Sequence, residues 1–199
     1  MNLRFTTQAW EKLWLYIRLA ESEVGGLGSV VPQDGGFVMT DCFLIDQRAT
    51  DVDTTLEPEA LSRFLVDYAA AGNDPGALRL WWHSHAREQV FWSMDDEHTI
   101  DNFGGELLVA LVGNFAGKFL ARMDRFEPKR ETEGWLDVVP SGPPPALDGP
   151  AAAAARADLQ RCVRVVTRRT NKPWTDADMP HRHDWVLRGR RAETDEAYD

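Results

Sequence analysis

The sequence predicts an α/β fold of the α+β kind, in which a mixed β-sheet is flanked by helices and a helical tail follows. Runs with helical apolar spacing alternate with short strand-like runs along residues 1–139. Apolar residues make up 43% of the 199 residues, and eight residues are Trp, so the chain can bury a sizeable core. The composition changes at Pro140, where the tail is expected to separate from this core.

The first predicted elements are a helix and a hairpin. Apolar residues recur near the N-terminus at i, i+3, i+4 and i+7, which places them on one helical face. They are Trp10, Leu13, Trp14 and Ile17. Thr6 or Thr7 is placed to cap this helix. Strands follow over residues 24–31 and 37–45, and the turn residues 33–36 between them predict a hairpin.

A second helix and a third strand come next. Pro58 stands in the first turn of the helix, and the segment 70–76 ends it. Its apolar face consists of Leu61, Phe64, Leu65 and Tyr68. The third strand is predicted over residues 78–85, and Ser93 begins a short helix that stops by Gly104.

The last core elements are strands. Residues 106–112 and 118–123 predict a second hairpin, and residues 135–139 a final strand. This pattern supports one core domain over residues 1–139.

The remaining chain is predicted as a Pro-rich linker over residues 140–149 and a tail over 150–199. The linker has the stiff character of polyproline. In the tail, residues 151–170 are expected to be helical and the rest irregular. One stripe of the tail helix is apolar and must pack on this core, on a second copy or on a partner. It consists of Leu159, Cys162, Val163 and Val166.

The charge and cysteine content narrow the function classes. The formal charge is −10, and its acidic excess lies in residues 1–139, which argues against nucleic-acid binding through a basic surface. No apolar run is long enough for a transmembrane helix, and the N-terminus lacks a signal-peptide pattern. The two cysteines, Cys42 and Cys162, form no CxxC pair. We therefore expect a cytoplasmic protein that binds neither membrane nor nucleic acid.

A candidate metal site follows the third strand. His83 and His85 are two residues apart at the end of an apolar strand, so their side chains share one face and can bind one metal ion. Asp96, in the first turn of the next helix, is the candidate third ligand. Three protein ligands leave a fourth position for water, as in catalytic zinc sites.

The His-x-His pair and the Ser-x-x-Asp motif, taken separately, could each serve the fold rather than a metal site. Ser93 and Asp96 alone resemble a capping box, and a single His-x-His pair on a strand more often serves packing. His181 and His183 have the same spacing in an irregular, Pro-flanked segment, where no held geometry is expected. The combination of motifs is what favours a metal site near Asp96.

The combined motif resembles the JAMM motif of the JAB/MPN metalloproteases. It reads His83-Ser-His85, seven residues, Ser93, two residues and Asp96. The family also places a glutamate upstream, as in Glu23-Val-Gly-Gly-Leu here. The resemblance covers about residues 5–125 and implies a cytidine-deaminase-like MPN core.

That resemblance implies a role for each motif residue. His83, His85 and Asp96 would hold one Zn²⁺ with a bound water, whose pKa zinc lowers to about 7. Glu23 would be the general acid/base, and Ser93 would stabilise the oxyanion. Glu21 is a competing base, but the Val-Gly-Gly-Leu after Glu23 favours Glu23. Two further aromatic residues between the ligands, Phe91 and Trp92, are candidates for a substrate groove or for core packing.

The resemblance also implies a substrate class. We expect a compact prokaryotic stand-alone enzyme, similar to deubiquitinase-like isopeptidases, that cleaves peptide or isopeptide bonds after the C-terminus of a ubiquitin-like protein. It would act in deconjugation or precursor processing, and a bacterial conjugation or antiphage pathway is one setting. Activating or conjugating enzymes could bind the tail. The alternatives are a catalytically silent MPN scaffold in a complex, or a peptidase acting outside ubiquitin-like systems.

Overall fold

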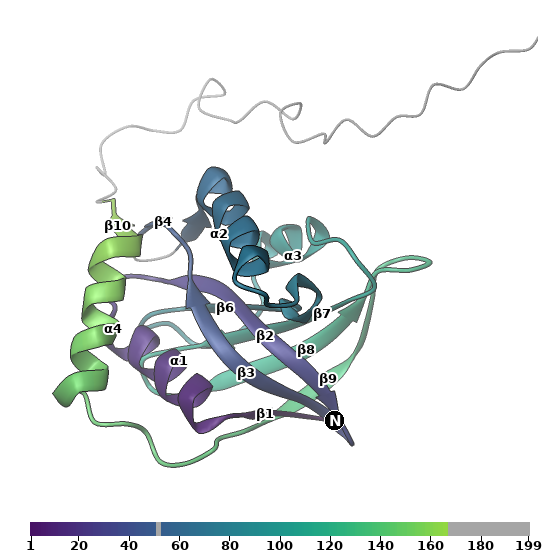
Figure 1. Ribbon diagram of the computed structural model, residues 1–199. Coiled ribbons are helices and arrows are strands. Elements are labelled where there is room, and N and C mark those ends of the chain that lie inside the picture. Colours follow the sequence, from purple (N-terminus) through teal and green to yellow (C-terminus); the bar gives the residue numbers. More distant parts are fainter. Residues whose placement is uncertain (51–52, 167–199) are drawn as a thin grey trace, which may run out of the picture. The chain divides into compact units, whose positions relative to one another are not determined.

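The computed structural model describes residues 1–50 and 53–166, and these form one compact unit (Figure 1). Seven strands make a closed barrel: β1 (Asn2–Phe5), β2 (Gly25–Gln33), β3 (Gly36–Leu44), β6 (Leu80–Ser84), β7 (Leu107–Gly113), β8 (Phe119–Arg125) and β9 (Glu131–Val139). A three-stranded sheet contains β4 (Gln47–Ala49), β5 (Thr54–Leu56) and β10 (Val163–Val165). The helices are α1 (Thr7–Leu19), α2 (Pro58–Ala70), α3 (Met94–Asp101), α4 (Gly149–Cys162) and the 3-10 turn η1 (Pro75–Ala77). None of the helices in this part of the chain is both long and apolar enough to cross a bilayer.

The expected fold class is wrong, because the sheet closes on itself. The sequence pattern and the MPN resemblance predicted an α/β sheet flanked by helices, whereas the barrel strands run in the order β1-β3-β2-β6-β7-β8-β9. Strand β1 closes the ring by pairing in parallel with both β3 and β9. Its four residues are too few to show an alternating pattern, although Leu3 and Phe5 are buried.

The barrel strands nevertheless include both predicted hairpins. Strands β2 and β3 pair antiparallel, as do β7 and β8, and both pairings confirm the predictions. The first helix is also confirmed, with Thr6 as its N-cap: the Thr6 side chain accepts a hydrogen bond from the Ala9 N–H at 3.1 Å. The predicted aromatic face of α1 packs into the main hydrophobic cluster.

Helix α4 lies beside α1, and both contact β3 (Figure 1). Ala152, Ala155 and Leu159 belong to the same buried cluster as the apolar face of α1. The Tyr16 hydroxyl donates a hydrogen bond to Asp158 Oδ2 at 2.9 Å, which links the two helices. Leu159 and Cys162 of the predicted stripe are therefore buried in the protein's own fold, whereas Val166 is exposed.

The predicted tail helix is too long. It ends at Cys162, and Val163–Val165 form β10, which pairs in parallel with β4. β-Branched valines favour an extended conformation, and β4 offers them a strand partner. Residues 167–199, including the His181 and His183 pair, lie outside the described residues.

Candidate metal centre

Strand β6 positions the two histidines. It lies between β2 and β7, and all five of its residues are buried. His83 is its penultimate residue and His85 follows its end, so the alternation of a strand gives both side chains one face. This arrangement agrees with the predicted common face.

The β2–β6 register brings Glu23 to the same place. Gly25 pairs with His83, and the Ser84 N–H donates to the Val24 carbonyl at 2.8 Å. Continuing this antiparallel register sets Glu23 opposite His85. The close approach of β2 to β3 requires a glycine at position 26, because a Cβ there would lie 2.0 Å from a backbone oxygen of β3.

Helix α3 supplies Asp96 and Ser93. The Ser93 Oγ accepts from the Asp96 N–H at 3.1 Å, and Asp96 Oδ2 accepts from the Ser93 N–H at 2.7 Å. This is a complete capping box. The structural interpretation of the Ser-x-x-Asp motif is therefore correct, and the same contacts hold the Asp96 carboxylate at the helix start.

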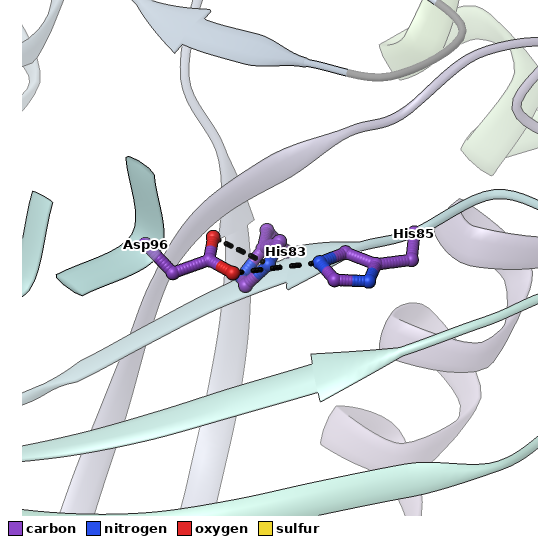
Figure 2. Close-up of side chains that lie close together, drawn as sticks. All are labelled: His83, His85 and Asp96. Atoms are coloured by element: carbon purple, nitrogen blue, oxygen red, sulfur yellow. Dashed lines mark ion pairs between the residues drawn. The ribbon is translucent and has the colours of Figure 1, made fainter. Parts of the chain in front are cut away.

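The three candidate ligands converge (Figure 2). Nε2 of His83 lies 2.9 Å from Asp96 Oδ1, and Nε2 of His85 lies 3.5 Å from Asp96 Oδ2. One ligand atom from each residue lies within 4.8 Å of the others, and all three residues are buried. Ligands at zinc distances of ~2.0–2.1 Å in a tetrahedron are about 3.3 Å apart, so these spacings suit a metal ion.

The hydrogen bonding of the two histidines also fits a metal site. Neither ring nitrogen of His83 has a hydrogen-bond partner among the described residues, although Nε2 lies 2.9 Å from Asp96 Oδ1. A buried polar atom without a partner is costly unless a ligand satisfies it. His85 Nδ1 lies 3.0 Å from the Gln89 carbonyl, which can only accept, so Nε2 is left with a lone pair for a metal.

The charge states of His83 and Asp96 suit metal binding as well. Burial lowers the pKa of His83, which favours the neutral imidazole that metals require. Burial opposes the ionised form of Asp96, but the two nearby histidines lower its pKa overall. For His85 the effect of burial is outweighed by Asp96 and the Gln89 carbonyl, so its pKa is raised in the metal-free protein.

These residues line a pocket of about 260 Å³ together with Glu23 and Ser93. Its walls include Trp81, whose ring stacks on His83 at 4.4 Å, and Phe91, whose ring meets His85 edge-on at 4.7 Å. No Lys or Arg lines it among the described residues. The carboxylates that line it are Glu23, Asp53, Glu88, Asp95 and Asp96.

Glu23 has the properties of a proton acceptor. Its side chain is 7% exposed, and burial raises its pKa to about 8 although the nearby His85 opposes this. A group whose pKa lies near neutrality can both take and release a proton at physiological pH. Glu21 does not line this pocket, which leaves Glu23 as the acid placed beside the ligands.

The structure thus brings together all five residues predicted for the site. Phe91 lines the pocket too, whereas Trp92 packs against a small hydrophobic cluster that includes Trp81. Sequence reasoning missed Asp53 and Glu88, which reach the pocket from irregular segments. Neither has a spacing to the motif that would have identified it.

Comparisons with known proteins add little to this geometry. No protein-family model matches the chain, and no curated protein matches it. The solution structure of protein DSY2949 from Desulfitobacterium hafniense is similar to 71% of this chain and 94% of its own, with 16% identity and a TM-score of 0.47. A similarity of this degree assigns neither a fold nor an activity.

Proposed function

We propose that the chain is a metal-dependent hydrolase that cleaves peptide or isopeptide bonds, with zinc held by His83, His85 and Asp96. The observation that carries the proposal is the convergence of three ligand atoms within 4.8 Å inside a pocket that Glu23 and Ser93 also line. Two imidazoles and one carboxylate form a donor set that zinc accepts. A catalytic site also needs a base, and Glu23 is the candidate.

When bound, zinc would supply a Lewis acid that polarises a carbonyl oxygen and makes water more acidic. Glu23 would take the proton of the attacking water as the water oxygen adds to the carbonyl carbon. When the C–N bond breaks, Glu23 would return that proton to the leaving nitrogen. In the metal-free protein burial raises the pKa of Glu23 to about 8, and a bound cation would lower it from there towards neutrality, where both transfers are favoured.

Ser93 would stabilise the oxyanion. Its Oγ already accepts from the Asp96 N–H, so its own hydroxyl proton remains available for a donor bond. Ser93 also lines the pocket beside the ligands. A donor fixed in this way by a helix cap needs little reorganisation during the reaction.

The substrate we propose is a ubiquitin-like protein joined through its C-terminus to another chain. The JAMM resemblance supports this class. Among the described residues, the pocket is lined by carboxylates, histidines and uncharged side chains. Such a pocket favours a substrate that carries basic side chains beside the scissile bond, because the isopeptide nitrogen of a lysine-linked conjugate is itself uncharged. An extended Gly-Gly tail can enter a narrow site of this kind.

We also propose that the enzyme acts in the cytoplasm. Both cysteines, Cys42 and Cys162, are buried free thiols. Free thiols persist where the compartment is reducing.

The test combines metal analysis with cleavage. Purified protein should contain about one equivalent of zinc and should cleave ubiquitin-like proteins fused through Gly-Gly to a reporter. The Glu23→Gln variant should keep the metal and lose cleavage. Absence of zinc would contradict the metal centre, whereas zinc without cleavage of any fusion would contradict the substrate class alone.

A further inference from the structure

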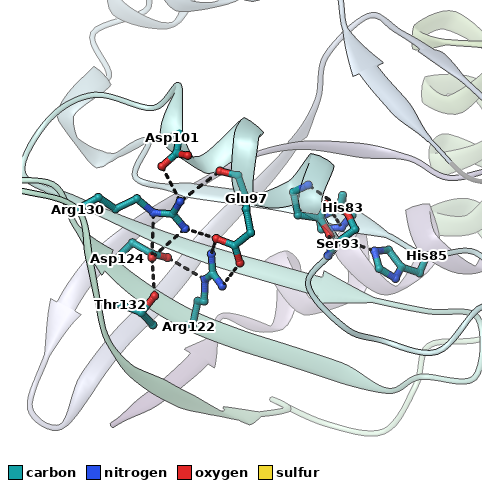
Figure 3. A network of polar contacts seen from close by, with 10 residues as sticks. His83, His85, Ser93, Glu97, Asp101, Arg122, Asp124, Arg130 and Thr132 are labelled. Carbon is teal, nitrogen blue, oxygen red and sulfur yellow. Dashed lines mark hydrogen bonds and ion pairs between the residues drawn. The ribbon is translucent and has the colours of Figure 1, made fainter.

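A second polar cluster joins α3 to β8 and to the connection between β8 and β9, on the side of α3 away from the histidines (Figure 3). Its centre is Glu97, the residue that follows Asp96 in α3. The charged members of the cluster are Glu97, Asp101, Arg122, Asp124 and Arg130. Glu97 does not line the pocket, so the proposed reaction does not use this cluster directly.

Arg122 forms the most buried contact of the cluster. Its Nη1 and Nη2 donate to both carboxylate oxygens of Glu97, at 2.6 and 2.8 Å. Its Nε donates to Asp124 Oδ2 at 2.9 Å. Arg122 is 4% exposed and Asp124 is fully buried, so solvent screens the Arg122–Asp124 ion pair little. A bidentate arginine fixes the direction as well as the distance of its partner.

Arg130 adds three further hydrogen bonds along the helix. Its Nη1 donates to Asp101 Oδ1 at 2.6 Å and to the Glu97 carbonyl at 3.2 Å, and its Nη2 donates to Glu97 Oε2 at 2.5 Å. Glu97 and Asp101 are one turn apart on the same face. The two arginines therefore hold both the position and the rotation of α3.

Apolar packing alone holds this helix weakly. Only Asp96 and Ile100 of its eight residues are buried, and Asp96 is itself a candidate ligand. A helix with one buried apolar side chain gains little from burial. The arginine contacts are therefore a main determinant of where α3 lies.

Arg122 also contacts the segment before α3. Its guanidinium lies over the Trp92 ring, 4.5 Å from the ring centre, and Trp92 lies 6.1 Å from the His83 ring. Trp92 directly precedes Ser93. A single arginine thus contacts the residue before Ser93 and the residue after Asp96.

We propose that Arg122 is a positioning residue for the metal centre, which fixes Asp96 and Ser93 through Glu97 and Trp92. This inference rests on the proposed metal site. Residues that orient metal ligands typically change metal affinity by 10–100-fold when mutated. The same size of effect is expected here, because a small rotation of α3 moves the Asp96 carboxylate away from the histidines.

The test measures zinc affinity in folded protein with a chromophoric chelator, for the parent, Glu97→Gln and Arg122→Lys. Glu97→Gln keeps the shape of a partly exposed side chain and is expected to fold, while Arg122→Lys keeps the charge but loses the bidentate geometry. The matched control is Glu133→Gln, which removes the exposed Arg125–Glu133 pair between β8 and β9 without touching α3.

We expect both cluster variants to bind zinc about 10–100-fold more weakly, with an altered visible spectrum when Co²⁺ replaces zinc. Glu133→Gln should match the parent in both measurements. If the two cluster variants bind zinc within about twofold of the parent, whatever their melting temperatures, the positioning role is wrong. If the parent itself binds no zinc, the proposed function fails and this inference fails with it.

Discussion

Nε2 of His83 and Oδ1 of Asp96 lie 2.9 Å apart without a hydrogen bond between them, although one residue belongs to β6 and the other to the start of α3. A carboxylate and an imidazole nitrogen that meet in this way in a buried site suit a shared cation, provided that the nitrogen carries its lone pair. The first predictions follow from this relationship.

Zinc should stabilise the protein through these ligands. A metal that binds only the folded state adds about 2.7 kcal/mol to the free energy of unfolding when its free concentration is 100 times its dissociation constant. We expect zinc to raise the melting temperature of the parent and chelation to lower it. The His85→Ala variant should show no zinc-dependent change. The control is His98→Ala, which alters an exposed histidine of α3 and should respond to zinc as the parent does.

Glu23→Gln should separate catalysis from metal binding. The amide cannot accept the proton of water, and loss of a general base typically costs about 10²–10⁴-fold in turnover. Zinc content should stay at the parental level, because Glu23 is not among the converging ligand atoms. The exposed neighbour supplies a control, and Glu21→Gln should retain parental kcat. An active Glu23→Gln enzyme would remove Glu23 from the mechanism.

The Ser93→Ala substitution should lower both stability and kcat, and the two effects can be measured separately. Ser93→Ala removes the helix cap, which costs about 1 kcal/mol of stability, and removes the oxyanion donor, which costs about 10²–10³-fold in kcat. Ser93→Thr keeps both the hydroxyl donor and the capping oxygen, so it should restore most of each. Urea unfolding and steady-state kinetics measure the two effects. If alanine lowers stability but leaves kcat unchanged, Ser93 is only a cap.

The candidate ligands were predictable from the sequence because their signals are local. His83 and His85 share a strand face, and Ser93 to Asp96 spans one helical turn, so spacing brings the residues of each pair together, whereas the JAMM resemblance joined the two pairs into one site. The contact between Arg122 and Glu97 joins residues of β8 and α3 that no periodicity relates. Asp53 likewise reaches the pocket only through the tertiary fold.

Barrel closure was not predictable for a similar reason. It depends on β1, whose four residues pair with β3 and with β9, which ends more than a hundred residues further along the chain. Short strands such as β4 and β10 also carry no alternating pattern of their own. Val163 and Val166 continued the apolar stripe of α4, so the pattern favoured a helix where pairing with β4 produces a strand over residues 163–165.

The Tyr16–Asp158 contact should make the docking of α4 sensitive to acid. Burial disfavours the Asp158 carboxylate, but hydrogen bonds from Arg161 and Tyr16 outweigh this and lower its pKa in the folded protein. A group with a lowered folded pKa stabilises the fold above its unfolded pKa of about 3.9 and loses that contribution as pH falls through the folded value.

Asp158→Asn should therefore cost about 1 kcal/mol near pH 7, a figure reduced because the side chain is partly exposed, and less at pH 3. Urea unfolding of parent and variant at both pH values measures this difference. A cost that stays the same at pH 3 would show that the carboxylate charge does not contribute. Asp67→Asn, in the exposed part of α2, should have little effect at either pH.

Gln47 should stabilise the segment that carries Glu23. Its buried amide donates to the carbonyls of Gly25 and Ile45, each at 2.8 Å, and its Oε1 accepts from the Gly25 N–H at 2.8 Å and the Thr54 hydroxyl at 2.7 Å. Gln47→Met fills a similar volume but leaves buried backbone groups of Gly25 unpaired, at about 1–3 kcal/mol each.

We expect Gln47→Met to lower the free energy of unfolding by about 2–4 kcal/mol and to reduce kcat more than zinc affinity, because Gly25 lies two residues from Glu23. The matched control is Gln33→Met, at the exposed end of β2, the strand that begins at Gly25. If Gln47→Met reduces stability but keeps the parental kcat in the folded protein, the amide supports the barrel without positioning Glu23. A fall in kcat that the control does not share would show that the hydrogen bonds of Gln47 extend their effect to the catalytic carboxylate.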